Sequence, residues 1–135
     1  MAKTNIIEYV NIASIGNATD FGDLLAVNQD MTGCSNGTRG IFAGGTAGNF
    51  SDVMQYITIA SAANAIDFGD LSVDVYGASA CSDGTKGCIG GGGTNTGGFQ
   101  RVTNIDYVNI TSIGKATDFG DLTLARTSAH ASSGD

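Results

Sequence analysis

Three pairs of aspartates are the residues whose type and spacing could do chemistry. Each pair brackets a Phe-Gly dipeptide in the string Asp-Phe-Gly-Asp-Leu, which occurs three times at spacings of 47 and 51 residues. The residues concerned are Asp20, Phe21, Gly22 and Asp23; Asp67, Phe68, Gly69 and Asp70; and Asp118, Phe119, Gly120 and Asp121. Carboxylate oxygens bind hard cations, so calcium is one interpretation of these pairs.

The bonding habits of aspartate in turns give a second interpretation of the same pairs. The spacing is not that of an EF-hand loop. Aspartate also holds bends in the chain by accepting hydrogen bonds from backbone N–H groups. We favour this repeat-structural role, because a catalytic or metal site would have to recur in three similar settings. We therefore expect no cofactor and no metal site.

The three cysteines offer a different kind of chemistry. Cys34 and Cys81 occupy equivalent positions in a second shared block, Cys-Ser-(Asn/Asp)-Gly-Thr-(Arg/Lys)-Gly, and Cys88 replaces Ile41. A four-residue turn at 83–86 would place Cys81 opposite Cys88, which allows a disulfide across the hairpin. Buried free thiols are the default interpretation, because no oxidising compartment is established.

Motifs for catalysis are missing from the sequence. The Asp-Phe-Gly strings lack the other elements of a protein kinase, and Gly90–Gly93 lacks the Gly-Lys-Ser/Thr ending of a phosphate loop. His130 is the only histidine, and its place near the end of the chain makes it a poor candidate for a general base. We expect no enzyme and no catalytic residue.

Charge and composition exclude further classes of function. The 135 residues carry a net charge of −7 and include only six Lys and Arg, which argues against nucleic-acid binding. No apolar run reaches the ~18 residues of a membrane span, and residues 1–5 do not lead into a signal-peptide core. We therefore expect neither nucleic acid nor a membrane among the partners.

The elements that position these motifs read as β-strands. Segments rich in β-forming residues begin at each tyrosine of the repeat, Tyr9–Ile12, Tyr56–Ile59 and Tyr107–Ile110. Asn36-Gly37 and Asp83-Gly84 are hairpin-turn dipeptides, and a further strand is expected to start at the bend of each Asp-Phe-Gly string. The fold class is therefore all-β, with about four strands in each unit of 47–51 residues, the size of a propeller blade.

The units define a single array over residues 1–135. Residues 1–33 form a partial unit, 34–80 and 81–131 form full units, and 132–135 form a tail. Sheets that are incomplete at both ends expose strand edges, which are templates for pairing with another chain. We expect neighbouring subunits to complete these sheets, with assembly edges at Ile7, Tyr9, Val10, Leu122 and Leu124.

The combined pattern resembles a repeat of tail and other virion proteins of bacteriophages, especially those of aquatic environments. Its marks here are the Asp-Phe-Gly-Asp-Leu core and the Cys-Ser-x-Gly-Thr-Arg-Gly block, and it covers nearly the whole chain. The glycine pairs also resemble a kelch blade, although the kelch tryptophan is missing. This resemblance implies a structural or attachment role in a virion or extracellular assembly.

Fewer than three units cannot close a propeller, which has at least ~4 blades. We therefore expect a self-assembling structural protein whose main partner is itself. Head-to-tail contacts of this kind grow into a filament, which we favour, or close into a ring. The alternative is a phage tail module that binds a receptor or a cell-surface glycan, which would need an exposed aromatic cluster.

Overall fold

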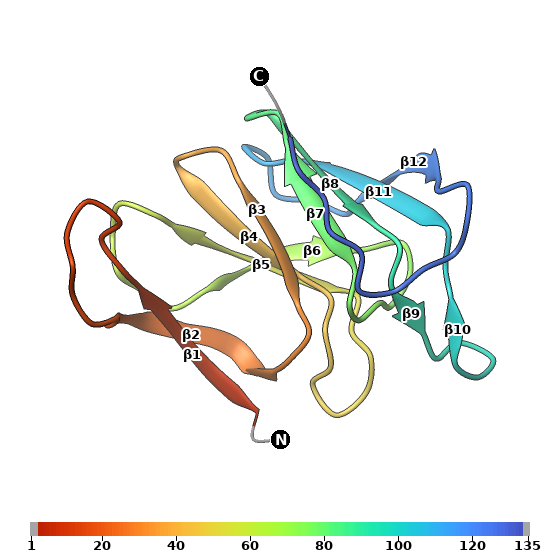
Figure 1. The fold of residues 1–135 in the computed structure, drawn as a ribbon, viewed down its shortest axis with the longest axis horizontal. Coiled ribbons are helices and arrows are strands. Elements are labelled where there is room, and N and C mark those ends of the chain that lie inside the picture. Colours follow the sequence, from red (N-terminus) through yellow and green to blue (C-terminus); the bar gives the residue numbers. More distant parts are fainter. Residues whose placement is uncertain (1–2, 134–135) are drawn as a thin grey trace.

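The chain folds entirely from β-strands in antiparallel sheets. The computed structural model describes residues 3–133, and within that range it contains twelve strands and no helix (Figure 1). The strands are β1 (Thr4–Tyr9), β2 (Thr19–Asn28), β3 (Thr32–Ser35), β4 (Arg39–Ala43), β5 (Val53–Thr58), β6 (Ile66–Asp70), β7 (Ser79–Ser82), β8 (Lys86–Gly90), β9 (Gly93–Thr94), β10 (Gln100–Arg101), β11 (Asn104–Asn109) and β12 (Thr117–Asp121). The all-β prediction is confirmed.

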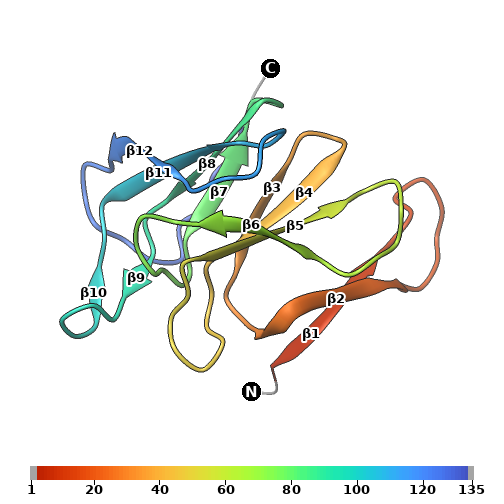
Figure 2. The same cartoon turned by 180° about the vertical axis from the view of Figure 1, so that it is seen from behind.

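Three sheets follow one another along the chain. The first sheet is the pair β1-β2, the second has the order β3-β4-β5-β6, and the third has the order β7-β8-β11-β12. The second sheet lies between the other two in both views (Figures 1 and 2). The small β9-β10 ribbon extends from the third sheet. Gly134 and Asp135, the end of the expected tail, lie outside the described residues.

The hairpins at the start of the second and third sheets form as the dipeptides predict. Asn36 Oδ1 accepts bonds from the two N–H groups after Gly37, at 3.0 and 2.9 Å. Asp83 Oδ1 accepts the equivalent bonds at 2.8 and 2.7 Å. The bonds from the Lys86 and Thr85 backbone lower the pKa of Asp83. The polar side chain thus closes each turn, while glycine supplies the positive φ, 82° at Gly37 and 87° at Gly84.

A strand starts at each Asp-Phe-Gly string, one residue before its first aspartate, but the string forms an irregularity within the ladder where we expected a bend before it. In β2, Ile7 pairs with Gly22 and Glu8 with Asp20, so Phe21 is an extra residue in the ladder. The same shift in register leaves Phe68 unpaired in β6 and Phe119 unpaired in β12. Each string is therefore a β-bulge, which re-aims the side chain of the extra residue.

The strands with the repeated tyrosines begin and end earlier than predicted. β1, β5 and β11 end at Tyr9, Thr58 and Asn109, although the apolar pattern runs on to the following isoleucine. The chain turns there instead, because the N–H groups of Ser14, Ser61 and Ser112 each bond to a carbonyl three residues earlier. Ile59 and Ile110 each keep one backbone bond to the neighbouring hairpin, to the carbonyls of Thr38 and Thr85, and the strands end there.

Apolar residues fill the spaces between successive sheets. One cluster between the second and third sheets contains Phe68, Met54, Ile41 and Ile110, all almost fully buried. A smaller cluster between the first and second sheets contains Ile7, Phe21 and Ala65. The bulged phenylalanines Phe21 and Phe68 thus anchor the packing of sheet on sheet. No helix long and apolar enough to span a membrane occurs among residues 3–133.

Gly69→Ala and Gly120→Ala form a matched pair that tests this packing. Both glycines have φ near +140°, so alanine carries the same backbone strain at each. A Cβ at Gly69 would collide with the Gly114 carbonyl oxygen, whereas one at Gly120 meets nothing within 4 Å. In urea unfolding of dilute protein, Gly69→Ala should lose about 1–3 kcal/mol more stability than Gly120→Ala. Equal losses would contradict the close contact.

Candidate functional site

The first aspartate in two of the three strings bonds to the backbone of its bulge. Asp20 Oδ1 and Asp118 Oδ1 each accept a bond of 3.1 Å from the N–H of the glycine two residues on. Asp70 forms an exposed ion pair with Lys115 at 3.3 Å, and Asp121 accepts a 2.7 Å bond from the Thr103 hydroxyl. Across residues 3–133, no group of three or more His, Cys, Asp or Glu is placed to hold a metal ion.

The cysteines gather around the hairpins of the second and third sheets. Cys81 and Cys88 are cross-strand partners in β7 and β8, and all three cysteines are free thiols in the structure. Burial, together with the neighbouring Cys81 and Cys88, raises the pKa of Cys34 to about 11. Cys81 and Cys88 lie opposite each other across the hairpin, as predicted, and the disulfide itself stays a prediction.

Among the hydrogen bonds that cross the junction between the first and second sheets, four that involve the backbone recur at the next junction. Three join backbone groups, and the fourth runs from the Leu25 N–H to the buried side chain of Gln55. The bonds are Ala65 N to Asp23 O (2.8 Å), Leu25 N to Gln55 Oε1 (2.7 Å), Thr46 N to Gln29 O (2.9 Å) and Gly77 N to Asp30 O (3.0 Å). They fix how the second sheet sits on the first.

The junction between the second and third sheets repeats these four bonds at equivalent sequence positions. The bonds are Ala116 N to Asp70 O (2.9 Å), Ser72 N to Asp106 Oδ2 (2.8 Å), Gly93 N to Tyr76 O (2.9 Å) and Ser128 N to Gly77 O (2.8 Å). Each donor and acceptor lies 47 or 51 residues after its counterpart. The two junctions therefore use one common set of contacts.

The bulged phenylalanines show where this series of junctions stops. Phe21 is 8% exposed under the second sheet, Phe68 is fully buried under the third, and Phe119 is 61% exposed. Gly120, next to Phe119, likewise has open space where Gly22 and Gly69 touch the following sheet. The third sheet thus presents an uncovered copy of the face that the second sheet buries.

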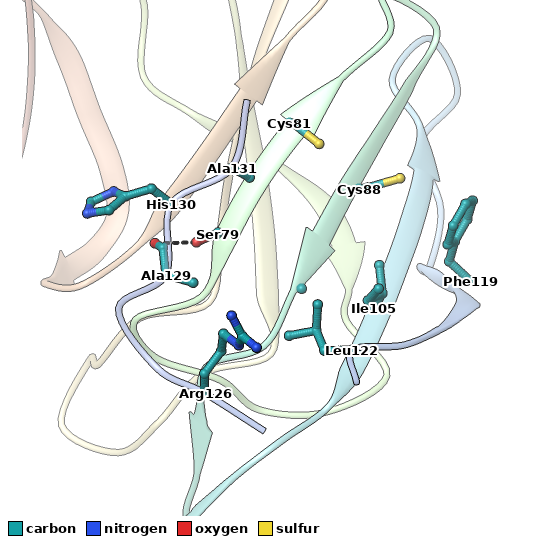
Figure 3. A pocket seen from close by; sticks show the side chains of 11 residues that line it. Ser79, Cys81, Cys88, Ile105, Phe119, Leu122, Arg126, Ala129, His130 and Ala131 are labelled. Atoms are coloured by element: carbon teal, nitrogen blue, oxygen red, sulfur yellow. Dashed lines mark hydrogen bonds between the residues drawn. The ribbon is translucent and has the colours of Figure 1, made fainter. Parts of the chain in front are cut away.

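We call this uncovered face the C-terminal surface and define it by Phe119, Gly120, Asp121, Thr123 and Ser128. It borders a largely apolar cavity of about 360 Å³, which Leu122, Ile105 and the two hairpin cysteines also line (Figure 3). The segment after Ser128 runs beside β7, where the Ser79 hydroxyl bonds to the Ala129 carbonyl (Figure 3). Apart from this segment, no described residue covers the surface.

The opposite end of the molecule presents the other side of the same junction. We define the N-terminal surface by Glu8, Val10, Ile12, Ala18 and Asp30, all of which are exposed. Val10 is 57% exposed and Ile12 97% exposed. Their counterparts in the third sheet, Val108 and Ile110, are buried against the second sheet at 3% and 0%. The N-terminal surface is therefore an uncovered copy of the face with which the third sheet packs.

A groove lies beside the N-terminal surface. β1 pairs only with β2 among the described strands, whereas the counterparts β5 and β11 each pair on both sides. The free edge of β1 borders a cavity of about 450 Å³ that Phe42 and Ile57 of the second sheet also line. In the other two sheets, the hairpin fills the position beside the strand that corresponds to β1.

The residues expected at assembly edges are distributed over these features. Ile7 is buried against the second sheet, while Tyr9 and Val10 line the groove and are half exposed. Leu122 lines the cavity of the C-terminal surface, and Leu124 is 66% exposed. Sequence reasoning missed Glu8, Thr123 and the exposed Phe119. They are found when the exposure of each residue in the structure is compared with that of its equivalents in the other repeats.

The reactivity of Cys34 gives a test of its burial. The thiolate is the nucleophile, and with a pKa of about 11 only about one Cys34 thiol in a thousand is ionised at pH 8. Alkylation of Cys34 by iodoacetamide, followed by peptide mass spectrometry, should accelerate about tenfold per pH unit up to pH 10. In urea the rate should level off near the ordinary pKa of 9.0. A native rate that levels off below pH 9 would contradict the burial.

Taken together, the structure has two exposed surfaces at opposite ends of the described residues, and a groove beside one of them. The polar side chains near them bond to backbone or to one another, as Asp20, Asp118 and Asp121 do. Neither a protein-family model nor a curated protein matches the chain.

Proposed function

We propose that the protein is a self-assembling structural protein whose copies stack head to tail. One observation carries this proposal: the N- and C-terminal surfaces are the two uncovered sides of a contact that the chain already makes twice internally. A second copy is therefore an occupant that fits each surface. The internal junctions supply the geometry that the contact between copies would reproduce.

The polar part of the contact can be taken from the internal junctions. For three of the four bonds at each internal junction, the equivalent donor and acceptor residues are exposed on the N- and C-terminal surfaces. Between copies they become Ala18 N to Asp121 O, Thr123 N to Glu8, and Asp30 N to Ser128 O. Asp30 (59°), Gly77 (61°) and Ser128 (55°) share a positive φ, which supports an equivalent backbone path at the contact between copies.

The apolar part of the contact centres on Phe119. In the internal junction Phe68 packs in a cluster with Val108 and Ile110. Between copies the corresponding residues are Phe119 of one copy with Val10 and Ile12 of the next. Full burial of a phenylalanine stabilises by about 1.5–3 kcal/mol, so this one residue supplies a substantial part of the association free energy.

Strand completion adds to this contact. Residues 130–133 follow Ser128 at the position where the third sheet's hairpin strand, Ser79–Ser82, follows Gly77. In a stack of copies, this segment of one copy lies in the same layer as β1 and β2 of the next. We propose that it enters the groove beside β1 and offers its backbone to the free edge, a form of β-augmentation.

The resulting assembly has blade-like layers, each an antiparallel sheet of the kelch-like kind. Because the two surfaces differ, the contact is heterologous and propagates into an open filament unless the rotation per copy closes a ring. We favour the filament; with three sheets in each copy, a closed ring of two copies with six layers is the alternative. The resemblance to phage repeat proteins supports a virion or extracellular location.

Concentration-dependent association tests this proposal, and two exposed phenylalanines provide a matched pair. Phe119 is 61% exposed on the C-terminal surface, and Phe99 is 56% exposed away from it. Sedimentation velocity and negative-stain electron microscopy of the wild type should show a growing series of oligomers and filaments. Phe119→Asp should weaken association at least ~100-fold, because it places an unpaired charge in an apolar contact. Phe99→Asp should assemble like the wild type.

Two results would contradict the proposal. The first is a wild-type chain that stays monomeric from micromolar to millimolar concentrations. The second is an assembly that Phe99→Asp and Phe119→Asp weaken equally. Rings in place of filaments in the micrographs would keep the head-to-tail contact and change only the closure.

One cluster of side chains favours the binding module as a second candidate function. The rings of Phe50 and Tyr76 lie 4.5 Å apart, and those of Tyr76 and Phe99 lie 5.9 Å apart. Asp74 lies nearby in sequence and accepts hydrogen bonds of 2.8 Å from the Thr94 and Thr96 hydroxyls. Burial alone would raise the pKa of Asp74, but these bonds lower it. Aromatic faces beside a carboxylate and hydroxyls suit a sugar ring of a cell-surface glycan.

A glycan array distinguishes the two functions. If the cluster binds sugars, the Phe119→Asp monomer should bind at micromolar strength and Phe99→Ala should abolish binding. If this monomer binds no glycan while the wild type assembles, the structural role stands alone.

A further inference from the structure

Glu8 occupies a repeat position whose side chain accepts a backbone hydrogen bond at both internal junctions. Its counterparts are Gln55 in the second sheet and Asp106 in the third, both buried at 3% and 2% exposure. Gln55 Oε1 accepts a 2.7 Å bond from the Leu25 N–H of the preceding sheet. Asp106 Oδ2 accepts a 2.8 Å bond from the equivalent N–H of Ser72. Each buried acceptor therefore serves a backbone donor of its neighbour.

The junction between the second and third sheets adds side-chain donors to this bond. The Ser72 hydroxyl donates to both carboxylate oxygens of Asp106, at 2.7 and 2.9 Å. Asn104 Nδ2 donates to Asp106 Oδ1 at 3.0 Å. Both oxygens of the buried Asp106 carboxylate thus accept hydrogen bonds from the protein. One of the donors is the hydroxyl of Ser72 in the neighbouring sheet.

The two surfaces at the ends of the chain present the same donor and acceptor without a partner. Thr123 follows Asp121-Leu122 as Ser72 follows Asp70-Leu71, and it carries a hydroxyl at the same atom. Glu8 has a side chain of the same length as Gln55, so its carboxylate reaches as far as the amide that serves Leu25. Both Glu8 and Thr123 are exposed. Glu8 is also the only glutamate of the chain.

We infer that Glu8 of one copy accepts hydrogen bonds from the backbone N–H and the hydroxyl of Thr123 of the preceding copy, and that this pair fixes the register of the head-to-tail contact. The inference rests on the proposed function and names the residues by which one copy recognises the next. Glu8 is a positioning residue, because this pair selects one alignment of the two surfaces and adds its own affinity to that of the apolar contact. A shift by one residue along β1 would bury the carboxylate without a donor, which is costly.

The contribution of this bond to binding can be measured without polymerisation by using two variants, each of which keeps only one of the two surfaces. Ile12→Asp disables the N-terminal surface and leaves the C-terminal surface intact, and Phe119→Asp does the reverse. Each variant alone should be a monomer, and their mixture should form a one-to-one complex whose Kd is measured by titration calorimetry. Glu8 variants are placed in the Phe119→Asp partner and Thr123 variants in the Ile12→Asp partner.

The expected results form a double-mutant cycle. Glu8→Ala should weaken the Kd about 10- to 100-fold, the range for a lost hydrogen bond to a charged group. Glu8→Gln should recover most of the affinity, because glutamine already does this task at Gln55. Thr123→Val should weaken binding less, since it keeps the N–H. Its effect should largely vanish when Glu8 is alanine.

Matched controls separate the pair from general charge and folding effects. Asp52→Ala removes one negative charge at an exposed site outside both surfaces and should leave the Kd unchanged. Circular dichroism and urea unfolding of each variant should match the parent, because Glu8 and Thr123 are exposed in the single copy.

Two outcomes overturn the inference and are distinct from failure of the proposed function. One is a Glu8→Ala variant that binds within twofold of its parent. The other is additive effects of Glu8→Ala and Thr123→Val. Both leave head-to-tail association intact. If the two parent variants do not associate at all, the proposed function itself fails.

Discussion

The rest of the structure depends on one local constraint, the β-bulge at each Asp-Phe-Gly string. The extra phenylalanine leaves the hydrogen-bond ladder and turns into the space between sheets. The following glycine takes a φ between 135° and 147°, where a side chain would be strained. At Gly22 and Gly69 it also lets the backbone of the next sheet touch its own. The same three residues of the motif therefore form the bulge in one sheet and make the contacts with the next sheet.

This constraint explains why the molecule has two kinds of end. Sheets that stack by a directional contact always leave one unmatched face at each end of the stack. Solenoid proteins normally close such ends with atypical, polar capping repeats. Here Ile12 on one end surface is 97% exposed and Phe119 on the other is 61% exposed. Apolar side chains on both surfaces favour our proposal of a partner with the same contact.

Much of the fold could be predicted from local sequence, because local chemistry determines it. Asn36-Gly37 and Asp83-Gly84 specify their turns through side-chain bonds that depend on no distant residue. The strand ends were less predictable, since a turn at Asn11 competes with the apolar pattern that runs on to Ile12. The bulge also escaped the sequence reasoning, because an aspartate that bonds to a glycine two residues on looks the same in a bend and in a bulged strand.

The N- and C-terminal surfaces were harder to predict, because the exposure of their residues depends on whether another sheet packs on them, which the local sequence does not encode. Phe21, Phe68 and Phe119 have the same neighbours in sequence, and only the arrangement of sheets gives them different exposure. The same holds for Glu8, which looks like an ordinary charge on an exposed strand until its counterparts Gln55 and Asp106 are seen to be buried.

Electrostatics then limits how such a contact can work. Each copy carries a net charge of −7, so copies repel one another over a distance of about a Debye length, ~8 Å at physiological salt. The Asp70–Lys115 ion pair joins the second and third sheets, but its counterpart between copies would pair Asp121 with the neutral Asn17. The proposed contact between copies therefore gains nothing from that ion pair. In our proposal, its strength comes from the apolar packing of Phe119, from backbone hydrogen bonds and from the bonds that Glu8 accepts, and these act only once the two surfaces meet in register.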